Sequence, residues 1–128
     1  MRIKQISVFL ENTPGHLEKL CKVLADAQIN LQTITIAETK DYGIVRAIVD
    51  KPEEAITALK DNGFFAKSVD VLAVEVDDKP GALSAILKRT SDVGLNIEYM
   101  YALTRSDSGK PVMVMSFKDL DAAESILK

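Results

Sequence analysis

The clearest feature of the chain is a change of hydrophobic period that occurs early and is followed by a turn signal. Residues 3–10 (IKQISVFL) alternate between two faces and are rich in β-branched and aromatic side chains, which predicts a strand. Residues 17–27 then carry apolar side chains at i, i+3, i+4 and i+7, which predicts an amphipathic helix. We expect this helix to begin at Pro14, with Thr13 as its N-cap. The apolar stripe consists of Leu17, Leu20, Cys21 and Leu24.

The rest of the first half predicts a hairpin and a second helix. Residues 30–39 and 44–50 are two strand-like segments, and Asp41-Tyr42-Gly43 between them predicts the turn. Pro52-Glu53-Glu54 opens a second helix, because acidic side chains are favoured near the positive end of the helix dipole, and Gly63 closes it. The first half therefore predicts the order strand, helix, strand, strand, helix.

The second half repeats this pattern. A shift of 66 residues places Pro14-Gly15 on Pro80-Gly81 and Asn30 on Asn96. After the second hairpin the shift becomes 68, which indicates an insertion of two residues near positions 107–110. Residues 64–76 (FFAKSVDVLAVEV) have the pattern of one strand that ends the first copy and begins the second.

These elements predict an α+β fold of two ferredoxin-like βαββαβ units in tandem, with antiparallel sheets. We expect the first unit to span residues 1–68 and the second 69–128. The second unit lacks its own last strand, since the sequence stops where its second helix stops. An open sheet edge is a liability, so we expect residues 1–5 to fill that position. The alternatives are a shortened sequence and an edge covered by another subunit.

Composition excludes several classes of function. The chain has 16 Lys and Arg against 19 Asp and Glu, a net charge of −3, and no basic cluster that would indicate nucleic-acid binding. No apolar run approaches the ~18 residues that span a bilayer, so we expect no membrane association. The single cysteine, Cys21, cannot form an internal disulfide and is expected to lie in the core. These features favour a cytoplasmic protein.

Candidate chemistry is sparse. Hydrolytic or acyl-transfer catalysis needs a nucleophile, a base and an orienting group. His16 is the only histidine in the chain, so the sequence offers no second histidine as the base of such a set. We expect His16 to be a surface residue at a helix start, with ligand contact as the alternative. Metal-binding spacings, a glycine-rich dinucleotide fingerprint and a P-loop are all missing from the sequence, which predicts no metal, no cofactor and no catalytic residue.

The repeated Pro-Gly corner is the remaining candidate site. A helix start offers unpaired N–H groups and the positive end of the helix dipole, which suit a carboxylate. Asn12 in one copy and Asp78 in the other precede the corner and can accept hydrogen bonds from an ammonium group. Such a corner suits an amino-acid zwitterion. In the structural alternative, Pro-Gly starts a helix and the Asn caps a turn.

The segments ENTPGHLEKLCKVLADAQINL and VDDKPGALSAILKRTSDVGLNIEYM resemble the signature of the ACT domain, a ligand-sensing module of amino-acid metabolism. The resemblance covers essentially the whole chain as two copies. It implies a regulatory protein without catalytic activity that binds a free amino acid and forms a homodimer. By this resemblance, the ligand-binding residues would be Asn12, Thr13, Pro14, Gly15, His16, Leu17 and Asn30 in the first copy, and Asp78, Lys79, Pro80, Gly81, Ala82, Leu83 and Asn96 in the second.

The resemblance has one informative departure. Some serine-sensing members carry a histidine where Leu10 and Val76 stand, which favours a ligand with a more apolar side chain. The alternative function is an interaction subunit that docks on a metabolic enzyme without binding a ligand, with Tyr99, Met100 and Tyr101 as interface instead of strand core. An acylphosphatase-like enzyme on the same fold is a more distant alternative.

Overall fold

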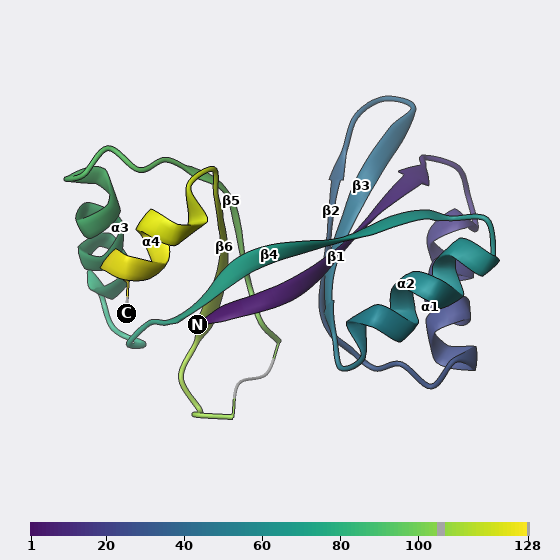
Figure 1. Cartoon of the computed structure of the whole chain (residues 1–128), viewed down its shortest axis with the longest axis horizontal. Helices are drawn as coiled ribbons and strands as arrows, with labels where there is room; N and C mark the ends of the chain where they lie inside the picture. Colours follow the sequence, from purple (N-terminus) through teal and green to yellow (C-terminus); the bar gives the residue numbers. More distant parts are fainter. Residues whose placement is uncertain (105–106, 128) are drawn as a thin grey trace. The chain divides into compact units, whose positions relative to one another are not determined.

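The computed structural model describes residues 1–104 and 107–127 and contains strands and helices in the predicted order (Figure 1). The elements are β1 (Arg2–Glu11), α1 (His16–Asp26), β2 (Leu31–Glu38), β3 (Tyr42–Val49), α2 (Pro52–Asp61), β4 (Phe65–Glu75), α3 (Ala82–Ser91), β5 (Ile97–Ala102), β6 (Val112–Phe117) and α4 (Leu120–Ile126). None of the described helices is long and apolar enough to span a bilayer.

The chain forms two compact units that share the long strands β1 and β4. Lys4–Val69 form the N-terminal unit, and the residues from Asp70 onward form the C-terminal unit together with Met1–Ile3. The 11 residues of β4 run without a break from one unit into the next, as the continuous apolar pattern predicted. The fold class is confirmed, with six strands and four helices in the described residues.

The N-terminal unit is a sheet with helices packed on one face. Its strand order is β2-β3-β1-β4, and β3 pairs antiparallel with both β1 and β2. Alternate residues of β1, Ile6, Val8 and Leu10, face a core that also contains Leu20 and Leu24 from α1. Cys21 is half-buried against this core, in agreement with its place in the apolar stripe.

The C-terminal unit repeats this arrangement, with its own core built on β4, β5, β6, α3 and α4. β6 pairs antiparallel with β4 on one side and with β5 on the other. On the free side of β4, Met1 and Ala73 exchange two backbone hydrogen bonds of 2.9 and 2.8 Å, the pattern of an antiparallel pair. The predicted filling of the missing strand position is therefore confirmed for Met1–Ile3, while Lys4 and Gln5 belong to the N-terminal unit.

The strand registers confirm the repeat and its insertion. Val8 pairs with Val45, and Val74 pairs with Met113. The partners on the first strands are thus 66 residues apart and those on the third strands 68 apart, as the sequence shift predicted. The two extra residues fall in the turn that contains Gly109, between β5 and β6.

The predicted turn at Asp41-Tyr42-Gly43 is wrong by two residues. Tyr42 and Gly43 already belong to β3, where they pair with Glu11 and Leu10 of β1. Thr39 closes the turn instead, donating its N–H to the Tyr42 carbonyl at 2.7 Å. Glycine fits the strand at this position with less crowding than other residues, because a Cβ at Gly43 would lie 3.2 Å from the Ala37 carbonyl oxygen.

Gln28 lies in the loop after α1 and has a backbone conformation that suits glycine. Its φ is 58°, whereas the aligned residue of the second copy is Gly94, with φ 75°. Both make the same cap, since Ile29 donates to the Leu24 carbonyl and Leu95 to that of Thr90. We expect Gln28→Gly to raise the free energy of unfolding by about 0.5–1 kcal/mol. The left-handed conformation costs a residue with a Cβ about 1–2 kcal/mol, and glycine removes this cost. Part of the gain is lost because glycine also increases the conformational entropy of the unfolded chain.

Urea denaturation of the wild type and of Gln28→Gly measures this difference. Gln28→Ala is the matched control, since alanine keeps the Cβ and should not stabilise the protein. Equal midpoints for the glycine and alanine variants would contradict the prediction.

Candidate functional site

The two Pro-Gly corners are turns that precede the helices, and not the first turns of the helices. His16 donates its N–H to the Thr13 carbonyl at 3.3 Å, and Ala82 donates to the Lys79 carbonyl at the same distance. The glycines have φ 85° with ψ −11° and −9°, the values of the third residue of a type II turn. The predicted helix start at Pro14 with Thr13 as N-cap is therefore wrong. Proline at the second position and glycine at the third form this turn with little strain, so α1 begins two residues later.

Each corner presents free N–H groups at a helix start. The first α-helical bond of α1 runs from the Lys19 N–H to the Gly15 carbonyl at 3.0 Å, and Ala85 bonds Gly81 in the same way. The N–H groups of Leu17 and Glu18 come before that bond and have no acceptor among the described residues. The positive φ explains the glycine, since a Cβ on Gly15 or Gly81 would meet no atom within 4 Å. The corner thus offers donors with open space beside them.

Several predicted contact residues lie on this surface. The half-buried side chain of Leu17 packs against the core of the N-terminal unit, and that of Leu83 packs against the core of the C-terminal unit. The turn residues themselves are exposed, namely Thr13, Pro14, Gly15, Lys79, Pro80 and Gly81.

His16 holds the first corner against the end of β1. The backbone N–H of Glu11 donates to its Nδ1 at 2.9 Å. The half-buried ring stacks on Phe64, with centroids 5.1 Å apart and planes 18° apart. These contacts give His16 a structural role in the turn, one that Ala82 of the second copy cannot provide.

Asn12 and Asp78 occupy aligned but different environments. Asn12 is tied to the hairpin between β2 and β3, since its N–H donates to the Asp41 carbonyl at 3.0 Å and its Nδ2 to the Lys40 carbonyl at 3.3 Å. This leaves Oδ1 of Asn12 as an acceptor. Asp78 is exposed and has no side-chain partner among the described residues. The neighbouring Asp77 instead makes an ion pair of 3.1 Å with Lys110.

Asn30 does not meet Asn12 within the N-terminal unit. The two residues flank opposite ends of α1, whose 11 residues span about 16 Å at ~1.5 Å per residue. The backbone of Asn30 is held by Asp50, which accepts its N–H at 3.0 Å, and its side chain is exposed. Asn96 is also exposed and lies at the far end of α3 from Asp78. One unit therefore supplies either the corner or the Asn to a given ligand, but not both.

The structure also shows an ionic cluster that the sequence did not reveal. The guanidinium of Arg2 lies 2.5 Å from Asp121, 3.4 Å from Glu124 and 3.8 Å from Asp70. The hydrogen bond with Asp121 raises the pKa of Arg2 above its usual value, so Arg2 stays a cation wherever the protein is folded. Arg2 and Asp121 are 119 residues apart, and no local pattern in the sequence relates them.

Two cavities lie away from the corners. One, of about 170 Å³, is in the C-terminal unit and is lined by Met1, Leu72, Val74, Glu124 and Leu127. The other, of about 560 Å³, is open to solvent and lies at the end of α2. It is lined by Lys60, Gly63, Phe64, Phe65, Ala66 and Lys67. None of the predicted ligand-binding residues lines either cavity.

Comparison with known proteins relates the chain to proteins of the same fold. A search of curated proteins found no match. A solved protein of Bacteroides thetaiotaomicron is 39% identical, with a TM-score of 0.91 over 99% of this chain and 87% of that one. The ligand-free regulatory subunit of aspartate kinase from Thermus thermophilus is 20% identical, with a TM-score of 0.66 over 96% of this chain and 89% of that one. The corresponding subunit from Thermus flavus is 17% identical, with a TM-score of 0.64 over 99% and 93%. At these two identities the likeness shows the fold alone.

The family model described as an ACT domain pair matches residues 1–127. The match agrees with the two aligned units. Each unit has its own core, and in each the first helix follows the same type II turn. The chain therefore belongs to the ACT domain pair family.

Proposed function

We propose that this protein is a regulatory protein without catalytic activity that binds a free amino acid at the Pro-Gly corners. The observation that supports the proposal most directly is the identical geometry of the two corners, with glycine φ 85° in each and free N–H groups at the start of each helix. These donors suit the carboxylate of the ligand. In the first corner, Oδ1 of Asn12 suits its ammonium group.

The spacing of the residues favours a site that is completed by a second copy of the chain. Since α1 separates Asn12 from Asn30, a ligand held by both would lie between the corner of one copy and the Asn30 of its partner. We therefore propose a homodimer as the binding form. Leu10 and Val76, which precede the corners, are buried and offer a ligand no polar side chain, so we propose a ligand with a more apolar side chain. We place this sensor in the cytoplasm, in accord with the composition.

Isothermal titration against the twenty common amino acids tests the proposal. We expect binding of at least one of them, and we expect Asn12→Ala and Asn30→Ala each to weaken it about tenfold, since one lost hydrogen bond to a charged group is worth about 1.5 kcal/mol. Asn62→Ala is the matched control, because the Asn62 side chain has one partner among the described residues, the Ala58 carbonyl of its own helix end. Silence across the panel would contradict the proposal.

Mixing the two variants tests the shared site. In a dimer of one Asn12→Ala copy and one Asn30→Ala copy, both changes fall in one site and the other site is wild type. Free exchange of subunits in an equal mixture should therefore restore about a quarter of the wild-type sites, as required by random pairing in a two-fold dimer. No restoration would contradict a site shared between two copies.

The second candidate is an interaction subunit that docks on a metabolic enzyme. The matched regulatory subunits of aspartate kinase prompt this proposal, although their identity to the chain is low. Co-purification of one enzyme from native extract, unaffected by added amino acids, would favour it over amino-acid sensing.

A further inference from the structure

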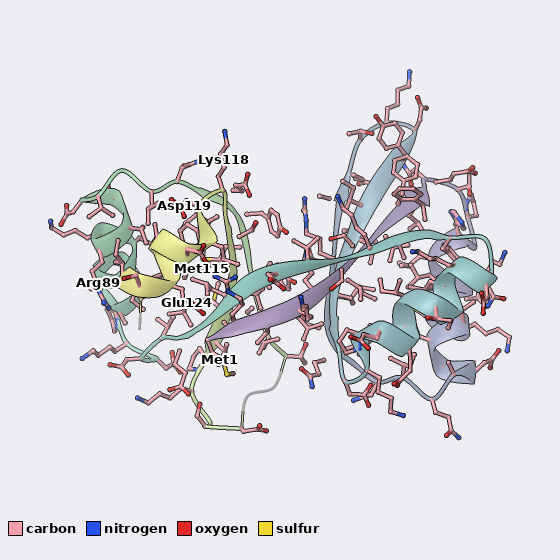
Figure 2. All side chains as sticks on the ribbon, viewed as in Figure 1. Met1, Arg89, Met115, Lys118, Asp119 and Glu124 are labelled. Carbon is pink, nitrogen blue, oxygen red and sulfur yellow. The ribbon has the colours of Figure 1, made fainter. Side chains whose placement is uncertain are left out.

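The sheet of the N-terminal unit has one face on which neither of its helices packs. Figure 2 shows side chains on both faces of the strands, and α1 and α2 share a core with Val8 and Val45 on one of these faces. Because side chains alternate along a strand, Phe9 of β1 and Ile44 of β3 point to the other face, which we call the open face.

Four large apolar side chains lie exposed on the open face. Phe9 and Ile44 pair directly across β1 and β3, and the rings of Phe9 and Tyr42 lie 4.8 Å apart. Phe65 belongs to β4, the neighbour of β1, and points to the same face because the residues before and after it are buried in the core. These residues, the apolar patch, are 44% (Phe9), 37% (Ile44), 47% (Tyr42) and 75% (Phe65) exposed.

Contacts of His16 place Phe65 at the same end of the sheet as Phe9. The ring of His16 stacks on Phe64, with centroids 5.1 Å apart, and its Nδ1 accepts the N–H of Glu11 at 2.9 Å. The start of β4 therefore lies beside the end of β1, and the two strands run in opposite directions.

The aligned positions of the C-terminal unit carry charges instead. By the shifts of 66 and 68, Phe9 corresponds to Glu75 and Tyr42 to Lys110. Lys110 makes an ion pair of 3.1 Å with Asp77, which corresponds to Glu11. The fold therefore does not require aromatic side chains at these positions, and an exposed apolar patch of this kind is typical of an interaction surface.

The area of the patch suits a specific contact between proteins. At ~200 Å² for a fully exposed aromatic side chain, the four residues expose about 400 Å² of surface. Since about 60% of an interface is apolar, each partner would bury roughly 700 Å², and both together about 1,400 Å². This total lies in the range of about 1,200–2,000 Å² that is usual for specific complexes.

The charges beside the patch favour a second copy of the chain as the partner. Glu11 lies two residues beyond Phe9 at the end of β1, and Lys67 lies two residues beyond Phe65 in the opposite direction. Neither makes an ion pair among the described residues, whereas Arg46 of the same face already has an interaction within the chain. A two-fold axis across the patch would bring Glu11 of each copy to Lys67 of its partner, with patch on patch between them.

We propose that the open face of the N-terminal unit is an interface between two copies of the chain. The apolar patches pack on each other, and Glu11 of each copy pairs with Lys67 of the other. The Pro-Gly corner and Asn30 flank α1, which packs on the opposite face, so this contact is separate from the proposed amino-acid site. With the homodimer of that site it gives a tetramer, and without it a dimer.

Sedimentation equilibrium of the full chain tests the interface. Phe9→Glu combined with Tyr42→Lys copies the side chains of the C-terminal unit, so the fold should accept both changes with an unchanged melting temperature. We expect the dissociation constant of the open-face contact to rise at least about 100-fold and the mass in solution to fall to half that of the wild type, because aromatic anchors dominate such contacts. Val93→Glu is the matched control, since Val93 is 56% exposed in the other unit and should leave the mass unchanged. Equal masses for the double variant and the wild type would leave the patch to a different protein and overturn the proposal.

Reversed charges test whether Glu11 and Lys67 meet across the interface. Glu11→Lys alone and Lys67→Glu alone should each raise the dissociation constant about tenfold, because like charges then face each other at both ends of the pair. A pair formed from one copy of each variant has opposite charges at both ends, so an equal mixture should associate within about threefold of the wild type. No recovery on mixing would overturn the proposal. Failure of amino-acid binding leaves these outcomes unchanged, because no free amino acid is present in either measurement.

Discussion

Replacement of Leu59 by alanine is expected to lower the free energy of unfolding of the N-terminal unit by about 2–5 kcal/mol. Leu59 is 0% exposed and lies on α2 in the core of that unit, with Ala55 of the same helix and Phe64 of the next segment. The substitution removes buried methyl groups and leaves a space that close-packed neighbours cannot fill. Urea denaturation, followed by circular dichroism, measures the loss.

Leu127→Ala provides a matched control in the C-terminal unit. Leu127 is aligned with Leu59, but it is 8% exposed and already lines a cavity of about 170 Å³. Because its side chain has fewer neighbours to lose, we expect a smaller cost, of about 1–2 kcal/mol. A loss at Leu127 equal to or larger than that at Leu59 would contradict the difference in packing between the two units.

Removal of Met1–Ile3 is expected to destabilise the C-terminal unit, although these residues are far from it in sequence. The deletion breaks both backbone bonds between Met1 and Ala73, at a cost of about 2 kcal/mol, and exposes one side of β4. It also removes Arg2 from its three carboxylates. Hydrogen exchange provides a local measurement, since the amide of Ala73 should exchange much faster in the shortened protein while that of Val45 changes little.

A double substitution separates the two contributions. Arg2→Ala with Ile3→Ala keeps the backbone of the strand and removes its side chains. If strand pairing matters most, Ala73 stays protected in the double variant and loses protection in the deletion. Fast exchange at Ala73 in the double variant would assign the stabilisation to the side chains instead.

Most of the fold could be predicted because hydrophobic period and repetition supported each other. The continuous strand across residues 64–76 was visible because no turn signal interrupts it, and β4 indeed spans Phe65–Glu75. The boundaries that were wrong lie at turns. Pro14-Gly15 is compatible with both a helix start and a type II turn, and only the bond from His16 to Thr13 decides between them. Tyr42-Gly43 has turn composition, yet pairing with β1 places it in a strand.

The candidate site could be predicted only in part, for a physical reason. The corner and the asparagine after the helix each recur in sequence, so both could be recognised locally. Their separation along α1 depends on the length and direction of the helix, and it decides whether one copy can hold a ligand with both. The ionic cluster at Arg2 depends on pairs up to 122 residues apart, for which a single sequence holds no periodic signal.

The pairing of Met1 with Ala73 has a consequence for synthesis on the ribosome. Met1–Ile3 emerge before the strand with which they pair, because Ala73, the partner of Met1, follows 72 positions later. At about 5–20 residues per second, Met1–Ile3 wait several seconds for β4 to appear. Their pairing then closes a long loop, which makes it a slow, high-contact-order step. Folding of the nascent chain should therefore begin with the unit made from Lys4–Val69 and end when Met1–Ile3 pair with β4.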